Sequence, residues 1–575
     1  MEKAFGCFDD CKTYLIFGTG ITGRSAISFC QKHNLKFFVA DDKKENLKKL
    51  EVEGQKVEEE RKLYKWNEKV LREAKIDFLV LSPSVHTQKD KHKIVELAEE
   101  IGIEIIADID LFYCYLQLFN QQYGTKKQII GITGTNGKST TTALVAHIFN
   151  QLGESAVACG NIGLNYLSLD VEKYELFVAE MSSYNLCLMK YAKFDCGCLL
   201  NITEDHLEYH GAMEKYIEAK ERIIFDSKKS VVCIDDNFCQ ALFNKANNQG
   251  LSCIEVSKNQ VLNNGLYWKN NQFYMDGRQV YQGVYKNLLG LHNVENILCA
   301  VAVAILTFSD SEEDINDHRE KVDLEDVVNK TMQRAQKNFN EKIREIGEKE
   351  GIHFDLKENG EKLSESIKNA EKVVYDYDNK EVKNNKNNEE SENDYNYNNY
   401  NANQNAEDRK EIELEDIFEA VKSFEGLPHR MQFVRNIDGI DFINDSKGTN
   451  ANSTQQALRA YADKDVYLIA GGQRKTAGFD FLKDDLASIK CVFLIGEATK
   501  SFAKELDKLG VKYEKCDVMK KAVKKAFEVA KSDLQSGVIG RQKAVVLLSP
   551  LCASWDQYRN FEERGYDFVK CVGEL

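Results

Sequence analysis

The chain has 575 residues, with 77 Lys or Arg against 92 Asp or Glu, so its formal net charge is −15 and its pI is about 5.4. At about 100 to 200 residues per domain, this length corresponds to roughly three to five domains. The acidic balance disfavours a broad basic surface, so we expect no nucleic-acid partner. Sixteen cysteines without framework spacing are typical of a reduced compartment.

Neither a signal peptide nor a membrane span is predicted. The first residues carry charges on both sides of any apolar stretch, unlike a secretory leader. The longest apolar run, from Ile297 to Phe308, is shorter than the about 20 residues that a transmembrane helix needs. We therefore expect a cytoplasmic protein without a membrane partner. We also expect a monomer.

Residues 13–42 read as strand, glycine turn, helix and second strand, and further βα signals continue to about residue 120. This pattern predicts a Rossmann-like domain over residues 1–125. Its turn contains Gly18, Gly20 and Gly23, and Asp41 follows about twenty residues later, as in the dinucleotide fingerprint. Two interpretations stay open: an NAD site, or a site for a nucleotide-linked substrate at the same helix N-terminus.

A second α/β unit, predicted over residues 126–308, has alternating strands and helices typical of a mostly parallel sheet. Its first strand runs into the sequence GITGTNGKST at 131–140, where a glycine turn and a helix N-terminus can bind phosphate. Lys138 can reach phosphate oxygens and Ser139 can bind Mg²⁺. The first glycine lies one residue earlier than in the strict phosphate-loop pattern, so the alternative is a chance glycine turn.

Three polar residues follow strands of this central unit. Glu180 ends the apolar strand ELFVAE, and Asp205 with His206 follows the strand CLLNIT. Ligands of parallel sheets bind at the carboxyl ends of strands, and Glu180 and His206 suit Mg²⁺ or Mn²⁺. The alternative is that they are solvated loop residues.

Residues 309–410 break the pattern, with charged residues throughout and eleven Asn among the 22 positions of 384–405. Such a segment buries too little apolar surface to fold by itself, so we expect a polar surface insertion. Residues 411–575 return to α/β, beginning with a helix and ending with a long helix from about Ser554. The predicted fold class is therefore α/β in three domains: Rossmann-like, phosphate-loop type with a parallel sheet, and Rossmann-like again.

Several motifs occur in the order in which they occur in the Mur ligases, and the chain resembles that family over nearly all of its length except the insertion. The motifs are GTNGKST, GNIG at 160–163, TEDH at 203–206, YIEAK ending at Lys220, HNVEN at 292–296, GLPHR at 426–430 and NDSKGTN at 444–450. The tail at 547–565 resembles the branch of the family that adds D-glutamate.

The resemblance implies an ATP-dependent amide ligase of cytoplasmic peptidoglycan synthesis. ATP would phosphorylate the carboxylate of UDP-N-acetylmuramoyl-L-alanine, and the amine of D-glutamate would attack the resulting acyl phosphate. Two alternatives stay open. One is a related ligase that adds another amino acid, or glutamate to folate. The other is a non-catalytic nucleotide-binding scaffold.

The resemblance also implies roles for individual residues, with two Mg²⁺ ions in the site. Lys138, His206 and Lys220 would be catalytic; one ion would be held by Ser139 and Glu180 and the other by His206 and a carbamylated Lys220. ATP would contact Gly134, Thr135, Asn136, Gly137, Lys138, Ser139, Thr140, Asn293, Asn296, Arg430 and Asp445. The sugar nucleotide would contact Ile21, Thr22, Asp41 and Asn161, and D-glutamate would contact Lys447, Thr449, Lys475, Ser554 and Phe561.

Overall fold

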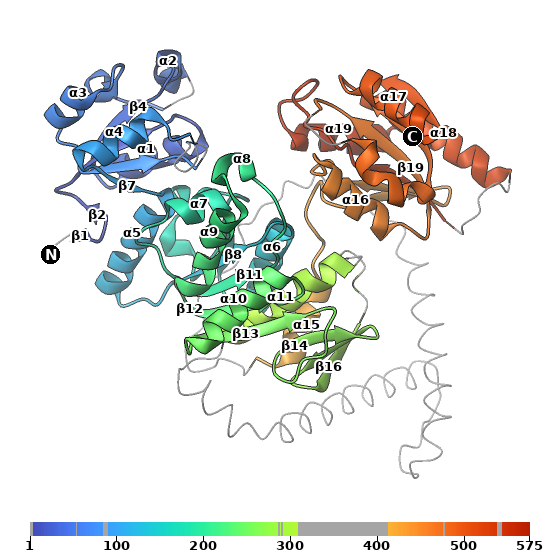
Figure 1. Cartoon of the computed structure of the whole chain (residues 1–575), viewed down its shortest axis with the longest axis horizontal. Helices are drawn as coiled ribbons and strands as arrows, with labels where there is room; N and C mark the ends of the chain where they lie inside the picture. Colours follow the sequence, from blue (N-terminus) through green and yellow to red (C-terminus); the bar gives the residue numbers. More distant parts are fainter. Residues whose placement is uncertain are drawn as a thin grey trace, which may run out of the picture. The chain divides into compact units, whose positions relative to one another are not determined.

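The computed structural model describes residues 4–52, 55–83, 85, 90–283, 285, 288, 291–308, 412–474, 478–536 and 543–575. The insertion predicted at 309–410 and the predicted site residue Lys475 lie outside these ranges. Within them the fold is α/β, as the sequence predicts, and Figure 1 shows its elements in chain order. No helix in the described part of the chain is both long enough and apolar enough to cross a bilayer.

The first sheet is parallel, because short apolar strands alternate with helices. Its strands run in the order β5 (Lys62–Leu63), β4 (Lys36–Ala40), β3 (Thr13–Phe17), β6 (Phe78–Leu81) and β7 (Glu104–Ile106). Its helices are α1 (Ile21–Lys32), α2 (Lys44–Val52), α3 (Glu68–Glu73) and α4 (Lys93–Ile101), and a hairpin of β1 (Ala4–Phe5) and β2 (Phe8–Asp9) precedes them. A Cβ on Gly23 would lie 1.8 Å from the carbonyl oxygen of Gly18, so only glycine lets α1 approach the turn after β3.

The central sheet is parallel from β9 to β14 and ends in an antiparallel extension. Its order is β16 (Arg278–Gln282), β15 (Gln272–Met275), β14 (Leu266–Lys269), β13 (Ser252–Ser257), β12 (Ser227–Cys233), β11 (Phe194–Leu199), β8 (Gln128–Thr133), β10 (Leu176–Glu180) and β9 (Ala156–Gly160). Its helices are α6 (Lys138–Gln151), α7 (Ser183–Leu188), α8 (Leu207–His210), α9 (Met213–Phe225), α10 (Asn237–Asn248) and α11 (Leu291–Phe308).

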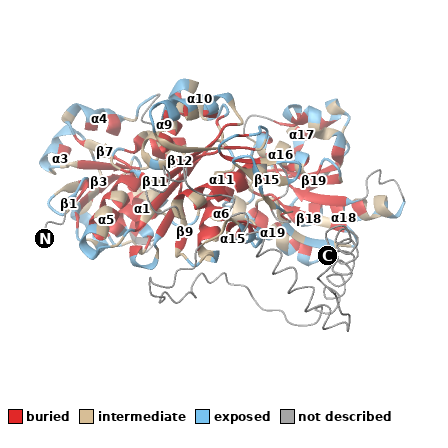
Figure 2. Cartoon of the chain, turned by 90° about the horizontal axis from the view of Figure 1, so that it is seen from below, coloured by how far each residue is buried: buried red, intermediate tan, exposed pale blue. Residues whose placement is uncertain are grey.

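The strands of this sheet are buried on both faces. Ile130 and Ile132 of β8 pack with α6 and α11 in one core cluster, whereas Ile129 packs with α9 and α10 in another. Buried residues accordingly follow the strands, while exposed residues lie on helices such as α4 and α10 (Figure 2). The continuous apolar runs of the sequence therefore reflect a sheet covered by helices on both sides.

Helix α15 (Leu414–Lys422) packs on the central domain, although the sequence prediction assigned it to the third. Phe418 is fully buried in the same core cluster as α6 and α11, and its ring stacks on that of Tyr281 at 4.6 Å. His147 of α6 and Ser423 share a hydrogen bond of 2.8 Å. The boundary at residue 411 stays a prediction, but this helix contributes its apolar face to the central core.

The third sheet has the order β17 (Gln432–Ile437), β18 (Ile440–Asn444), β22 (Ala544–Leu548), β19 (Asp465–Gly471), β20 (Ile489–Ile495) and β21 (Tyr513–Asp517). Only β17 is antiparallel to its neighbour among these described strands. The helices are α16 (Ala451–Ala460), α17 (Thr499–Leu509), α18 (Met519–Gln535) and α19 (Phe561–Gly573).

The prediction that the last helix begins near Ser554 is wrong. Helix α19 begins at Phe561, and the side chain of Asn560 caps it by accepting the N–H of Glu563 at 2.8 Å. Residues 554–560 form bends and turns instead of a helix, and the N–H groups of Gln557 and Tyr558 donate to the carbonyl oxygen of Ser554 at 3.2 and 2.9 Å. The serine therefore lies in an irregular segment rather than at a helix cap.

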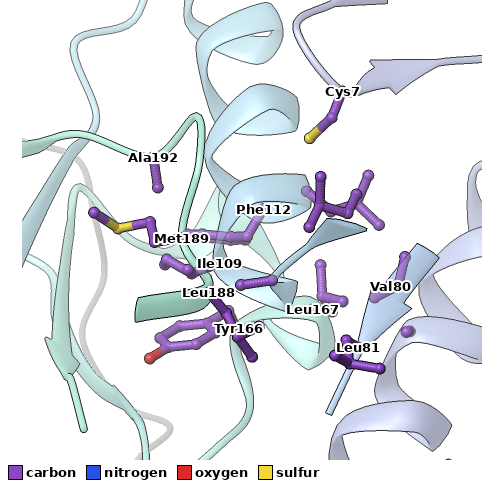
Figure 3. Packing of buried hydrophobic residues seen from close by; sticks show 14 of the residues in the cluster. Cys7, Val80, Leu81, Ile109, Phe112, Tyr166, Leu167, Leu188, Met189 and Ala192 are labelled. Atoms are coloured by element: carbon purple, nitrogen blue, oxygen red, sulfur yellow. The ribbon is translucent and has the colours of Figure 1, made fainter. Parts of the chain in front are cut away.

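The first and central domains share a continuous apolar core through helix α5 (Asp108–Tyr123). Ile109 and Phe112 of α5 lie between Val80 and Leu81 of the first sheet and residues of the central domain, among them Tyr166 (Figure 3). Such an interface resembles the inside of one domain more than a contact between two.

Asp110 fixes α5 against the central domain. Its carboxylate accepts the backbone N–H groups of Ala107, Lys190, Tyr191 and Ala192 at 2.7 to 3.0 Å. Burial raises the pKa of Asp110, although these hydrogen bonds favour its charged form. One side chain therefore satisfies four backbone donors that would otherwise be buried without acceptors.

We expect Asp110→Ala to lower the free energy of unfolding by about 3 kcal/mol or more, because it leaves buried N–H groups unsatisfied. Asp110→Asn keeps one acceptor oxygen and should lose less. Urea denaturation measures both, with the exposed Asp480→Ala as control. Equal stability of the Ala variant and the control would contradict this role of Asp110.

Candidate active site

A cavity of about 510 Å³ lies where strands of the first and central sheets end. Its lining residues follow the carboxyl ends of β3, β6, β8, β9, β10 and β11, the edge at which parallel sheets bind ligands. Six predicted site residues line it: Ile21, Thr22, Lys138, Asn161, His206 and Lys220. The lining also includes Gly20 of the glycine turn and Asp205 beside His206, and six residues that the sequence does not predict as site residues: Ser82, Pro83, Ser182, Ser183, Tyr184 and Tyr216.

The glycine turn after β8 leads into α6 through Gly137, which has a φ of +84°. A Cβ at this position would also lie 2.3 Å from Oδ1 of Asn296, so both backbone and space require glycine. Asn296 accepts the hydroxyl of Thr141 at 3.1 Å and donates to Oδ1 of Asn293 at 2.9 Å. The structure thus brings both predicted asparagines of α11 to the start of α6.

Lys138 is folded back onto the turn. Its Nζ donates to the carbonyl oxygens of Gly134 at 2.7 Å and Thr135 at 2.8 Å. Burial lowers the pKa of Lys138 and the charge of Arg430 lowers it further, while Glu180 opposes both. Among the described residues, this half-buried ammonium donates to neutral carbonyl oxygens, so it is well placed to bind an anion such as phosphate.

Glu180 ends β10 with only 5% of its surface exposed. Its Oε2 atom is buried and has no hydrogen-bond partner among the described residues. A buried carboxylate oxygen without a donor is costly unless a cation binds it. Together with the hydroxyl of Ser139 at the start of α6, this orphaned oxygen fits a magnesium ion, which prefers oxygen ligands.

Lys220 is not the surface lysine that its helix pattern alone would favour, because only 1% of it is exposed. Its Nζ donates to the carbonyl oxygen of Gly134 at 2.8 Å and to Oγ1 of Thr133 at 3.3 Å. Burial lowers the pKa of Lys220 well below its ordinary value, and repulsion from Lys138 adds to this. A neutral amine is the form that reacts with carbon dioxide, so the environment fits carbamylation.

His206 has a φ of +53° at the N-terminus of α8, which turns its side chain out of the helix. The side chain is 41% exposed, and its ring centroid lies 5.0 Å from that of Tyr184. Nε2 lies 3.5 Å from a carboxylate oxygen of Asp205. The imidazole therefore borders the cavity without a strong hydrogen bond to the described residues.

In the first domain, Ile21 is 74% exposed at the start of α1, where it lines the cavity. Asp41 does not line it. Its carboxylate accepts the N–H and O–H groups of Thr19, both at 2.9 Å, and the side-chain amide of Asn46 at 2.9 Å. Asp41 therefore shapes the glycine turn, and its role toward a ligand stays a prediction.

The third domain contributes charged groups that do not line the cavity. Lys447 donates from Nζ to Oγ of Ser139 at 3.0 Å, and burial lowers the pKa of Lys447 to about 8. Burial also raises the pKa of Asp445 to about 6, although Ser549 donates to it at 2.8 Å. Nε of Arg430 is buried without an acceptor in the described ranges.

The predicted D-glutamate residues are partly placed together. The Nζ atom of Lys447 lies 5.5 Å from the centre of the Phe561 ring, and the N–H of Thr449 donates to the carbonyl oxygen of Lys447. Ser554 is buried in the segment before α19. Their roles toward an amino acid stay predictions, as does that of Lys475, which lies outside the described residues.

Sequence reasoning missed two polar residues beneath the phosphate loop. Asn201 follows β11, and its side chain binds the backbone of Asn136. Glu295 of α11 accepts from Asn201 at 2.5 Å. A signal was present, since Asn201 ends an apolar strand and Glu295 lies inside the HNVEN motif, but a contact between two distant segments needs the fold.

Family models match the chain in three places. They are Mur ligase MurD-like, N-terminal domain, over residues 12–107; Mur ligase middle domain, over 132–304; and Mur ligase, glutamate ligase domain, over 429–550. A UDP-N-acetylmuramoylalanine--D-glutamate ligase of Caldicellulosiruptor saccharolyticus is 31% identical over 98% of this chain and 99% of its own. One of Wolbachia pipientis is 30% identical over 97% of this chain and 96% of its own.

The chain belongs to the Mur ligase family. The NAD interpretation of the first glycine turn is thereby set aside. The three Mur ligase matches fall inside the three predicted α/β domains, whose own boundaries stay predictions. Among solved structures, a MurF from Acinetobacter baumannii covers 86% of this chain and 93% of its own, with a TM-score of 0.48 at 12% identity.

A pH-dependent difference in stability is expected at Lys447. A lysine whose pKa is lowered on folding destabilises the folded state as long as the lysine is charged. This destabilisation is lost as the pH rises from about 8, the pKa in the folded state, to the ordinary pKa of a lysine. Without nucleotide, Lys447→Met should therefore unfold at a higher temperature than the parent at neutral pH. Thermal unfolding as a function of pH should show this gap closing above about pH 8, and a gap independent of pH would contradict the assignment.

Proposed function

We propose that this Mur ligase adds D-glutamate to UDP-N-acetylmuramoyl-L-alanine at the expense of ATP. The observation that carries the proposal is the cavity, which joins the glycine turn of the first sheet to the phosphate loop and its half-buried Lys138. The names of relatives that match it over nearly the whole chain support this choice of substrates. ATP and the uridine nucleotide point to a cytoplasmic enzyme, which we further propose acts as a monomer.

The first step would join two anions, the substrate carboxylate and the γ-phosphoryl group, so its barrier is largely one of charge and alignment. Lys138 would leave the carbonyl oxygens of Gly134 and Thr135 for phosphate oxygens. A carboxylate is a poor acyl donor, and phosphorylation gives it a good leaving group while ADP departs. The convergent N–H groups of the loop and of the first turn of α6 would hold the phosphates.

Magnesium ions, when bound, would neutralise the phosphate oxygens that meet in this step. Ser139 and Glu180 would hold one ion, because Oε2 of Glu180 is buried and unpartnered among the described residues. His206 and Lys220, once carbamylated, would hold a second. The amine of Lys220 already donates to the carbonyl oxygen of Gly134, and a carbamate would supply the anionic oxygen ligands that magnesium prefers, so the second ion would depend on the modification.

In the second step the amine of D-glutamate would attack the acyl phosphate, and the tetrahedral intermediate would collapse to amide and phosphate. Lys447, Thr449, Lys475, Ser554 and the N–H of Phe561 are the groups that we propose for the two carboxylates of D-glutamate. Cations and hydroxyls suit a dianion. Lys447 also lies at Ser139, which places one of these groups beside the phosphate loop.

The proposal predicts phosphate release that requires ATP, Mg²⁺, UDP-N-acetylmuramoyl-L-alanine and D-glutamate together. Omission of UDP-N-acetylmuramoyl-L-alanine or of D-glutamate should abolish net amide formation, because the first supplies the carboxyl group and the second supplies the amine. A coupled phosphate assay with mass spectrometry of the product measures this. Equal turnover with L-alanine or meso-diaminopimelate in place of D-glutamate would refute the substrate assignment.

Lys138→Ala should lower kcat/KM at least about a thousandfold, as removal of a charge clamp from a phosphoryl transfer site does. Folding should be intact, because among the described residues Lys138 donates to carbonyl oxygens of its own loop. Steady-state kinetics and thermal unfolding measure the two effects. The exposed Lys126→Ala is the matched control, and near-normal turnover of Lys138→Ala would show that the loop is not the phosphoryl site.

A further inference from the structure

Asn201 uses its backbone and side chain to bind the phosphate loop. Its carbonyl oxygen accepts the N–H of Thr135 at 2.9 Å, and its Oδ1 accepts the N–H of Asn136 at 2.8 Å. Nδ2 donates to the carbonyl oxygen of Asn136 at 3.2 Å and to Oε1 of Glu295 at 2.5 Å. Three consecutive peptide groups of the loop are thus held by one residue that follows β11.

Glu295 determines which way the amide of Asn201 points. An ionised carboxylate only accepts hydrogen bonds, so it requires the NH₂ group of Asn201 on its side. The amide oxygen is then left facing the N–H of Asn136, which needs an acceptor. Glu295 is 6% exposed and lies on α11 between Asn293 and Asn296, so this interaction joins α11 to the loop.

Lys258 is the cation that lets Glu295 be charged while buried. Its Nζ forms an ion pair with Oε2 of Glu295. Burial works to lower the pKa of Lys258, but the charge of Glu295 raises it above its ordinary value. Asp235 accepts the backbone N–H of Lys258 at 2.9 Å and the hydroxyl of Ser257 at 2.5 Å, which fixes the segment that carries the lysine.

This group of residues also resembles a metal site, since ligand atoms of Cys233, Asp235 and Glu295 lie within 4.8 Å of one another. The carboxylates, however, already accept from protein donors: Glu295 from Asn201 and Lys258, and Asp235 from Ser257 and Lys258. The ammonium of Lys258 therefore occupies the place that a metal cation would take. Glu295 is in turn hydrogen-bonded to Asn201, which binds the phosphate loop.

We propose that Asn201 is a positioning residue of the ligase, and that Glu295 acts through it, oriented in turn by Lys258. Together they hold the backbone of Thr135 and Asn136 in the nucleotide-binding conformation before ATP arrives. A loop fixed in this way loses less conformational entropy on binding than a mobile one. The proposal rests on the proposed function only in taking an adenine nucleotide as the ligand of the loop.

An exchange of the amide and the carboxylate tests this. In Asn201→Asp the new carboxylate faces Glu295 and cannot donate to Asn136, so the Kd for Mg·ADP should rise at least about tenfold in calorimetry of the full chain. Glu295→Gln in that background restores one donor and one acceptor and should recover at least about threefold. The KM for ATP should follow the Kd, while the KM for D-glutamate stays unchanged.

The matched control is Asn150→Ala at the opposite end of α6. Asn150 also binds backbone, donating to Ala146 and Ala156 at 2.8 and 2.9 Å and accepting the N–H of Ala156 at 3.1 Å. Its loss should lower the Tm but leave the Kd for Mg·ADP within about twofold, since these contacts are far along the helix from the loop. A control that weakens nucleotide binding as much as Asn201→Asp would overturn the proposal.

A second test avoids the pair of like charges, in case Asn201→Asp does not fold. Glu295 is hydrogen-bonded to Asn201 and Lys258 and not, among the described residues, to the loop itself. If Glu295 acts through Asn201, Glu295→Ala should weaken Mg·ADP binding in the parent protein. The same substitution should have no further effect in a protein that already carries Asn201→Ala. Equal losses in both backgrounds, or an unchanged Kd in Asn201→Asp, would overturn the proposal. A parent protein that does not bind Mg·ADP at all would instead contradict the proposed function.

Discussion

The structure of the site depends on one short backbone segment, the phosphate loop at 134–137, which must keep its polar groups converged without a ligand. Side chains from distant segments hold it. Gly137 lies against Asn296 of α11, Asn201 binds the peptides of Thr135 and Asn136, and Lys220 of α9 donates to Gly134. Because an unpaired buried peptide group is costly, each of these bonds also constrains the conformation of the loop.

Positively charged side chains are concentrated around the phosphate loop. Lys138, Lys220 and Lys447 all have lowered pKa values, chiefly because burial disfavours their charged forms, and they also repel one another or Arg430. Glu180 offers the main opposing charge to Lys138. The half-buried ammonium groups of Lys138 and Lys447 would be stabilised by a polyanion, so their mutual repulsion favours the binding of a triphosphate.

Features that depend on neighbouring residues in the chain can be predicted from the sequence, whereas contacts between distant parts of the chain cannot. The three α/β units and the phosphate loop follow from local patterns, because strand, glycine turn and helix are adjacent in the chain. The start of α19 is mispredicted because Asn560 caps it, six residues after Ser554 gives the first apparent cap signal. Asn201 and Glu295 were missed because their contact joins residues 94 apart, and only the packed sheet brings them together.

Burial explains the other differences. Lys220 sits in a helix whose charged pattern resembles a surface, and only the packing of α9 against β8 and β11 shows that its amine is enclosed at Gly134. Asp41 has the spacing of a ribose ligand, yet its oxygens are taken by Thr19 and Asn46. A motif thus identifies which residue types are present, whereas the neighbours of each side chain decide whether it is free to bind.

The domains join the site by different kinds of contact, and this has a thermodynamic consequence. The first and central domains share an apolar core around Phe112, so the two sides of the cavity are held together whether or not a ligand is bound. Lys447 of the third domain instead reaches Ser139 through a charged hydrogen bond, at the cost of partly desolvating its ammonium group. An anion at the loop would relieve that cost. By linkage, whatever favours the contact of Lys447 would then also favour an anion at the loop, and the proposed binding of ATP would in turn favour this contact.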